Sequence, residues 1–202
     1  MPRWDKERRE EARRLDRITY EEMLEMASLG AKVLQTRSVE FAAKFNVPVE
    51  VNSSFKEGKG TLVTREDADM EAVAVAGVTG DRNQAKITIV GVPDKPGIAA
   101  QILGPVADAN IDVDVIIQNV SHDGRTDFSF TVHRNDYART IDLLKTKVAP
   151  AMSAREVAGD PKICKVSIVG IGMKSHVGVA SKMFRTLSEE GINIQMITTS
   201  EI

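Results

Sequence analysis

The sequence predicts an α+β fold of two split β-α-β sandwiches, in which helices cover one face of an antiparallel sheet. The main observation is an internal repeat, because the stretch from Lys86 to Ser121 recurs in degraded form from Lys165 to Ser200. Each copy reads as a β-branched strand, a loop, an amphipathic helix and a second strand. The copies differ in length only in the loop between strand and helix, where insertions are tolerated. We therefore expect one folding unit that is used twice.

Composition excludes several classes of protein. The chain has 202 residues, of which 42% are hydrophobic, and this is ordinary for a globular protein. A net charge of −2 and only 4% aromatic residues argue against a nucleic-acid-binding protein. The single cysteine, Cys164, excludes an internal disulfide and fits a reducing cytoplasm, and its place beside a strand predicts a buried structural thiol. No apolar run approaches the ~18 residues of a membrane span, so we expect a soluble cytoplasmic protein that does not bind membranes.

The first third of the chain is predicted to contain helices and short strands. Residues 1–16 form a charged leader. Thr19 and Glu22 have the spacing of a capping box at the start of a helix. Residues 31–34 and then Ser38–Phe45, with Ser38 as the N-cap, are predicted to form a further helix that ends at Asn46.

Short strands and a linker should follow. Pro48–Val51 and Gly60–Val63 are the predicted strands, separated by a glycine-containing turn. Thr64–Met70 is a charged linker, and Glu71–Val78 is a further strand ahead of the first copy.

The first copy can be completed from the residues that follow it. Arg125–His133 alternates apolar and polar residues as a strand does, a helix is expected from Asp136 to about Val148, and a strand near Ala154–Val157. Together these give the order β-α-β-β-α-β. The second copy reaches only β-α-β by Ile202, and the spare strand Glu71–Val78 could complete it.

Two long segments carry a family resemblance. GVPDKPGIAAQILGPVADANIDVDVIIQNVS (residues 91–121) and GIGMKSHVGVASKMFRTLSEEGINIQMITTSEI (residues 170–202) resemble the paired ACT domains of aspartate kinase. Tyr20-Glu-Glu-Met and Ser28-Leu-Gly-Ala-Lys-Val-Leu resemble the last part of the kinase domain of that enzyme. The resemblance implies two ferredoxin-like ACT domains preceded by a helical fragment of an amino-acid kinase domain.

The resemblance also implies domain boundaries. After the leader, residues 17–64 would be the kinase-domain fragment and residues 65–84 a linker and strand. Residues 85–160 would be the first ACT domain, and residues 161–202 the second, incomplete unless strand 71–78 completes it.

The loop before the first-copy helix holds the most unusual chemistry. Asp94-Lys-Pro-Gly97 stands at a helix N-terminus, where free N–H groups and the helix dipole favour a carboxylate or a phosphate. Asp94 would suit an ammonium group, so the loop could hold a zwitterionic amino acid. The competing interpretation is that Asp94 only stabilises the helix N-terminus.

In aspartate kinases the matching residues line a pocket for an amino-acid end product. Gln118, which can donate and accept, suits a hydroxyl or an amide of the effector. Met173 replaces Asp94 in the second copy, so we expect one strong site and one altered site. The full set of effector-binding residues predicted in this way is Asp94, Lys95, Pro96, Gly97, Ile98, Ala99, Asp112, Val113, Asp114, Gln118, Val179, Ala180, Asn193, Ile194, Ser200 and Glu201.

Catalysis by this chain alone is not expected. No glycine-rich phosphate loop is present. By resemblance Lys32 matches a nucleotide-binding lysine, although a surface lysine on a helix is the simpler interpretation. His122, His133 and His176 lie too far apart in sequence for a metal site. Asp112 and Asp114, at i and i+2 on a strand, should share its solvent-exposed face. We therefore do not expect them to act in acid–base catalysis.

The function that the resemblance implies is the regulatory region of aspartate kinase, the first enzyme of the lysine, threonine and methionine pathway. It would bind threonine, lysine or both for feedback inhibition. The chain itself needs no cofactor, whereas the complete enzyme uses ATP and Mg²⁺. We expect a homodimer through the ACT domains or a heteromer with a kinase-bearing chain. The alternative is a free-standing ACT-type module that controls another enzyme.

Overall fold

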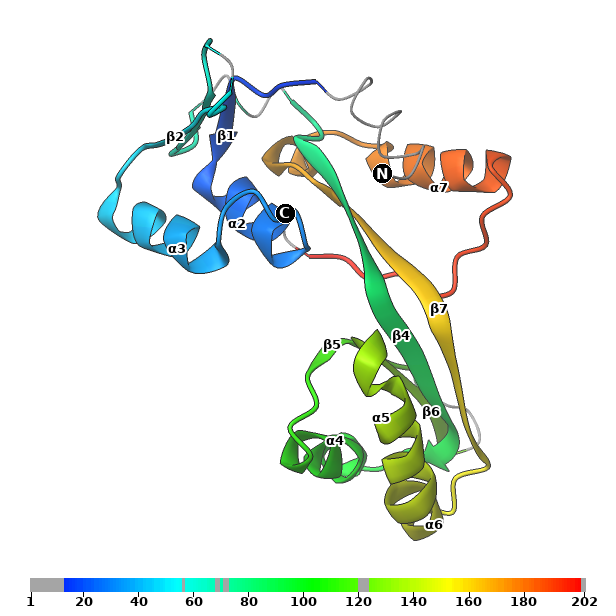
Figure 1. Cartoon of the computed structure of the whole chain (residues 1–202). Helices are drawn as coiled ribbons and strands as arrows, with labels where there is room; N and C mark the ends of the chain where they lie inside the picture. The colour runs from blue at the N-terminus through cyan, green and yellow to red at the C-terminus, as the bar shows by residue number, and fades with distance from the viewer. Residues whose placement is uncertain (1–12, 56, 68–69, 71–72, 120–123, 201–202) are drawn as a thin grey trace. The chain divides into compact units, whose positions relative to one another are not determined.

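The computed structural model describes residues 13–55, 57–67, 70, 73–119 and 124–200. The chain divides into two compact units (Figure 1). Unit 1 comprises Met1–Gly80 together with Val166–Ile202, and unit 2 comprises Asp81–Lys165. Nearly the whole second copy of the repeat therefore folds with the first third of the chain.

Unit 2 is built on a four-stranded sheet. The strand order is β5-β6-β4-β7, and β6 pairs antiparallel with both β4 and β5. The elements follow one another as β-α-β-β-α-β, which confirms the predicted order. Their bounds are β4 Gly77–Pro93, α4 Ile98–Asp108, β5 Val113–Gln118, β6 Arg125–His133, α5 Tyr137–Leu143, a π-helical turn Leu144–Val148, α6 Ala149–Met152 and β7 Glu156–Val169.

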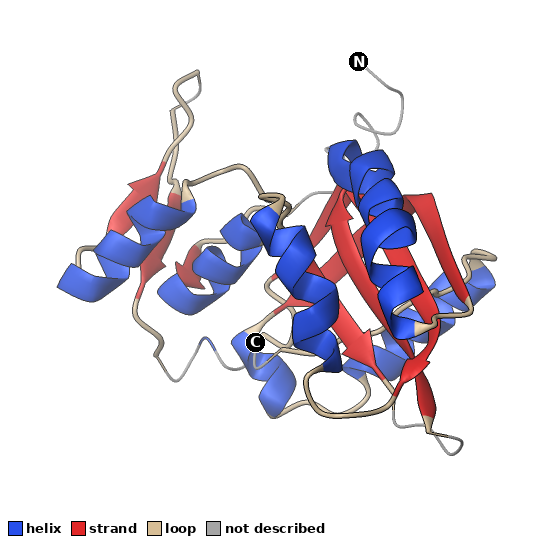
Figure 2. Cartoon of the chain, turned by 90° about the horizontal axis from the view of Figure 1, so that it is seen from below, coloured by secondary structure: helices blue, strands red, loops and turns tan. Residues whose placement is uncertain are grey.

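The core of unit 2 lies between the sheet and the helices (Figure 2). Alternate residues of β4 point into it, because strand side chains alternate between the two faces. Ile87 of β4 lies opposite Phe130 of β6, and both are fully buried. Helix α4 covers them with Ile102 and Val106 at helical spacing. The helix predicted to end near Val148 continues through the π-helical turn and α6 to Met152.

The first third of the chain packs as a small α/β layer in unit 1. Strands β1 Arg17–Thr19, β3 Thr61–Thr64 and β2 Val49–Val51 form a three-stranded sheet in that order, with β1 parallel to β3 and β2 antiparallel to it. Helices α2 Tyr20–Ser28 and α3 Thr36–Phe45 supply Met23 and Val39 to its core. This part is therefore a mixed α/β piece rather than a purely helical one.

The capping box at α2 is confirmed. Thr19 Oγ1 accepts a hydrogen bond from the Glu22 amide at 3.0 Å, and the Glu22 carboxylate accepts one from the Thr19 amide at 3.1 Å. The prediction for α3 was wrong at its start. The helix begins at Thr36 with Gln35 as N-cap, because the Gln35 carbonyl already accepts from the amides of Ser38 and Val39.

Other local predictions in unit 1 were also wrong. Residues 31–34 are not helical, and strand β1 was not predicted. Within the described residues of Glu71–Val78, only Gly77 and Val78 are strand. These two residues begin β4, which continues to Pro93.

Strand β7 joins two segments that the sequence suggested were separate strands. It runs through Gly159 and Pro161 without a break. The predicted burial of Cys164 was wrong: the thiol is exposed. Side chains alternate along β7, and Cys164 shares the exposed face with Lys162 and Val166.

The second copy departs from the first after its strand. Helix α7 Val179–Glu189 forms, but none of its residues is buried. The predicted strand that starts at Ile192 is absent from the described residues, where 192–200 are irregular. The segment before β4 packs against the end of β7 instead, since the Ala76 amide donates to the Val169 carbonyl at 2.8 Å. No helix of the described residues is both long enough and apolar enough to cross a bilayer.

Substitution of Gly170 tests this packing. A Cβ added there would lie 2.5 Å from the Ala74 carbonyl oxygen and 2.9 Å from Val75 Cα. The backbone of Gly170 is extended (φ 172°), so any cost is steric rather than conformational. We expect Gly170→Ala to lower the free energy of unfolding by about 1–3 kcal/mol in urea titrations. Gly80→Ala, where a Cβ meets nothing within 4 Å, is the control. Equal stability of the two variants would contradict this packing.

The pH dependence of stability tests a polar cluster at the start of β4. Burial tends to raise the pKa of Asp81, but hydrogen bonds from the Asn83 amide and Gln84 Nε2 and the charges of His133 and Lys165 outweigh it, so the pKa is lowered. A carboxyl whose pKa is lower in the folded state stabilises the fold above its unfolded pKa of about 3.9. That stabilisation is lost as the pH falls through the folded pKa.

We therefore expect the free energy of unfolding of the wild type to decrease as the pH falls below about 4, and that of Asp81→Asn to decrease less. Urea unfolding at a series of pH values measures both slopes. Identical slopes would show that Asp81 contributes nothing to the acid sensitivity.

Candidate functional site

The loop that follows β4 is shaped by a β-bulge. The register of β4 against β6 shifts between Ile89 and Val92, and Gly91 there has φ +67°. Asp127 of β6 accepts a hydrogen bond from the Gly91 amide at 2.9 Å, and Arg125 donates to the Gly91 carbonyl at 2.5 Å. Such a bulge redirects the end of a strand. The two side chains thus set the direction in which the loop leaves the sheet, which the sequence did not reveal.

The loop itself is exposed and ends in a glycine that starts the helix. Asp94 lies in it, and the Asp94 amide donates to the Gly124 carbonyl at 3.0 Å. Gly97 is the N-cap of α4, with φ +86° and no side-chain hydrogen bond to the cap. This left-handed conformation favours glycine. The first amides of α4 have no acceptor within the helix, and they carry the positive end of its dipole.

These groups suit a molecule with opposite charges a few ångströms apart. The helix N-terminus favours a carboxylate, and the Asp94 carboxylate favours an ammonium group. Ile98 is buried in the core of unit 2, and Ala99 packs against that core. The core therefore holds the first turn of α4 rigidly behind the exposed loop.

The topology places Gln118 at the same end of the sheet. Strands β4 and β5 are both antiparallel to β6, so β4 ends at Pro93 and β5 ends at Gln118 where β6 begins. Gln118 is exposed and lies opposite Phe128. The predicted residues Asp94–Ala99 and Gln118 thus occupy one end of the sheet.

Asp112, Val113 and Asp114 lie at the start of β5, the opposite end of the sheet. The four residue steps from Asp114 to Gln118 span about 13 Å of strand, which is too far for one amino acid to contact both side chains together. Both aspartates are exposed, as the strand pattern predicted. The Asp114 carboxylate forms an ion pair with the Lys165 ammonium group, with 2.6 Å between Oδ2 and Nζ. The structure therefore divides the predicted unit 2 residues between two places.

The remaining predicted effector residues belong to unit 1. Gly178, the N-cap of α7, has φ +92° and repeats the geometry of Gly97. The residues predicted there are Val179, Ala180, Asn193, Ile194 and Ser200. Glu201 lies outside the described residues. Met173 lies in the short helical turn Ile171–Lys174, and His176 lies between that turn and α7, where its ring contacts the Gly172 carbonyl at 2.7 Å.

Lys32 is exposed in the turn between α2 and α3 rather than on a helix, and its φ is +26°. Within the described part of the chain, no three His, Cys, Asp or Glu side chains gather as metal ligands would. His122 lies outside the described residues.

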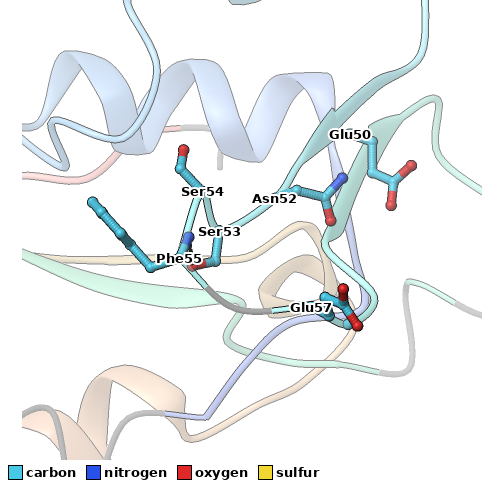
Figure 3. Close-up of a pocket in the computed structure, with 7 residues that line it drawn as sticks. Glu50, Asn52, Ser53, Ser54, Phe55 and Glu57 are labelled. Carbon is cyan, nitrogen blue, oxygen red and sulfur yellow. Dashed lines mark hydrogen bonds between the residues drawn. The ribbon is translucent and has the colours of Figure 1, made fainter.

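A hollow of about 480 Å³ lies along the loop between β2 and β3 (Figure 3). Figure 3 shows Glu50, Asn52 and Glu57 at one end of the loop and the Phe55 ring at the other. The described residues that line it include two carboxylates, those of Glu50 and Glu57. None of the predicted site residues lines it.

Comparison with protein families identifies two domains of one kind. Residues 86–147 match a family model described as an ACT domain, and residues 166–202 match a second model with the same description. These segments include the two loops that precede α4 and α7.

Comparison with individual proteins gives a consistent result. The chain is 60% identical over 194 residues to an aspartokinase of Pseudomonas aeruginosa, covering 95% of this chain and 47% of that protein. It thus spans about half the length of the curated relatives that it matches first. A crystal structure of aspartokinase alpha and beta subunits is 62% identical with a TM-score of 0.59, covering 64% of this chain and 84% of the other.

Two further solved structures bear on regulation. The regulatory subunit of aspartate kinase from Thermus thermophilus is 40% identical with a TM-score of 0.59, covering 64% of this chain and 85% of the subunit. Aspartokinase III of E. coli, in complex with lysine and aspartate, is 29% identical with a TM-score of 0.63, covering 93% of this chain and 41% of that one.

Proposed function

Because the chain belongs to the aspartate kinase family and contains two ACT domains of its regulatory region, we propose that it binds an end-product amino acid and thereby controls a kinase domain. The observation that carries this proposal is the exposed loop Asp94–Gly97. It joins a carboxylate to a helix N-terminus that lacks a side-chain cap. An α-amino acid presents the two complementary charges.

The proposed effectors are threonine, lysine or both, and the proposed process is feedback control of the first step of the pathway to these amino acids. A related aspartokinase is described in complex with lysine, which supports an amino-acid effector of this class. The Gln118 side chain, at the same end of the sheet, can donate to and accept from a polar side chain of the effector.

Control would act by a shift between two states. An effector changes kinase activity only as far as it binds one conformation more tightly than another. ATP and Mg²⁺ would act in the kinase domain of a complete enzyme. The proposed location is the cytoplasm, consistent with a single cysteine.

A free-standing amino-acid-binding module is the second candidate. The compact core around Ile18, Met23 and Val63 favours the first candidate, because residues 17–64 form an ordered α/β piece that a free module would not need. One related structure contains alpha and beta subunits of aspartokinase, and another is a regulatory subunit of aspartate kinase. These relatives support a heteromer with a kinase-bearing chain as one proposed assembly.

Removal of the Asp94 carboxylate tests the site. If Asp94 pairs with the ammonium group of the effector, Asp94→Ala should weaken threonine or lysine binding about ten- to a hundredfold, or 1–3 kcal/mol. Calorimetry on the wild type and the variant measures this. Asp108→Ala removes an exposed acid from the other end of α4 and should leave the affinity unchanged. Unchanged affinity in Asp94→Ala would mean that Asp94 only stabilises the helix N-terminus.

Added bulk at Ala99 tests the same site in a different way. Ala99→Thr should block effector binding at the first turn of α4 while the fold remains intact, since Ala99 is only partly buried. The melting temperature reports the fold, and calorimetry reports the binding. In a complete enzyme the variant should lose feedback inhibition and keep its uninhibited activity. Full inhibition of that variant would rule out this location.

Association follows from the open edges of the sheet. Strand β5 is an edge strand with Ile116 49% exposed, and β7 at the other edge has Val166 44% exposed. Edge strands tend to be paired or covered. We expect sedimentation at micromolar concentration to show a homodimer. A stable monomer with and without threonine would contradict this prediction.

A further inference from the structure

A buried carboxylate joins helix α2 to the second copy of the repeat within unit 1. Glu22 is only 3% exposed. Its Oε2 accepts from the amide and the hydroxyl of Thr19 at 3.1 and 3.2 Å. Its Oε1 accepts from the amide of Ile171 at 3.0 Å, which is 149 residues away in the chain. One side chain thus serves two segments that are remote in sequence.

The two oxygens have separate roles. A capping box needs one acceptor from the glutamate, and Oε2 supplies it. The other oxygen receives the first amide of the short helical turn Ile171–Lys174, whose N-cap Gly170 has no side chain to offer. A carboxylate that is out of contact with water requires such partners, since an unpaired buried charge is strongly destabilising.

Neighbouring residues of α2 reach the same region. Met26 fills the space beside Gly77, because a Cβ added at Gly77 would lie 2.6 Å from Met26 Cε. Glu25 Oε1 lies 3.5 Å from Ser200 Oγ, at the limit of a hydrogen bond. Positions 22, 25 and 26 share one face of a helix. That face of α2 meets the loop after β7, the start of β4 and the C-terminal segment.

The loop that Glu22 contacts corresponds to the candidate effector loop of the first copy. Both loops follow a strand of the repeat, and both end at a glycine N-cap with positive φ, Gly97 or Gly178. Helix α2, in turn, contributes Met23 to the core of the kinase-like part of the chain. Glu22 therefore stands between a loop of the ACT region and that core.

We propose that Glu22 is a positioning residue that couples the loop Gly170–Gly178 to helix α2, so that a displacement of the loop changes the start of α2. The regulatory purpose of this link rests on the proposed function, whereas the link itself is a property of the folded chain. Its carboxylate would hold both segments in one arrangement, because displacement of either leaves a buried oxygen without its donor.

Glu22→Gln tests the link in the intact chain. The amide offers one oxygen and one NH₂ group, so it can accept from Thr19 or from Ile171 but not from both in the present geometry. Hydrogen exchange of backbone amides measures the result. We expect whichever of the Thr19 and Ile171 amides loses its acceptor to exchange at least about tenfold faster, relative to Val63 as a reference in the same unit. Glu21→Gln, an exposed change of equal charge in the same turn, is the control.

A second change separates coupling from local capping. His176→Ala removes the contact of the ring with the Gly172 carbonyl and should loosen the loop. If Glu22 transmits the loosening of the loop to α2, His176→Ala alone should speed exchange of the α2 amides about threefold or more. Added to Glu22→Gln, the same substitution should have no further effect. An equal effect in both backgrounds, or no effect in the wild type, would overturn the proposal.

If Glu22→Gln does not fold, comparison of the wild type with His176→Ala still tests the link. Unchanged protection of the α2 amides in His176→Ala would overturn it. The experiment uses no effector. A failure of threonine and lysine to bind would therefore remove the proposed function without affecting this result, and calorimetry on the wild type reports that separately.

Discussion

Strand β4 is the element on which the rest of unit 2 depends. It lies between β6 and β7 in the sheet, and its alternate side chains Ala85, Ile87 and Ile89 are completely buried beneath the helices. Burial of that many apolar side chains is the main stabilising contribution available to a domain of this size. Because both neighbours of β4 pair along it, the positions of the loops at the end of the sheet follow from the register of this one strand.

The candidate site depends on where β4 stops being regular. The bulge at Gly91 is held by Asp127 and Arg125, so the loop that carries Asp94 is supported by side chains of β6 rather than by its own sequence. The helix behind it is anchored through Ile98 and Ile102. An exposed binding loop on a rigid support is a common arrangement in proteins that recognise small ligands. Gln118 comes to the same end of the sheet because β5, like β4, is antiparallel to β6.

The second copy of the repeat packs differently from the first. Its helix α7 buries no residue, and its last segment forms no strand within the described residues. Its loop instead depends on contacts with earlier parts of the chain. Ala76 pairs with Val169, and Glu22 accepts from Ile171. The same repeat thus serves as a self-contained fold in one copy and as a part of a larger packed unit in the other.

The sequence by itself determined the features that depend on near neighbours. The β-α-β-β-α-β order, the capping box of Thr19 and Glu22, and the helix start at Gly97 follow from periodicity and from hydrogen bonds within a few residues. Only the tertiary structure decided the length of β4 and β7, the exposure of Cys164 and the second partner of Glu22. These depend on strands and amides that are far apart in the chain, and local patterns carry no information about which distant groups will meet.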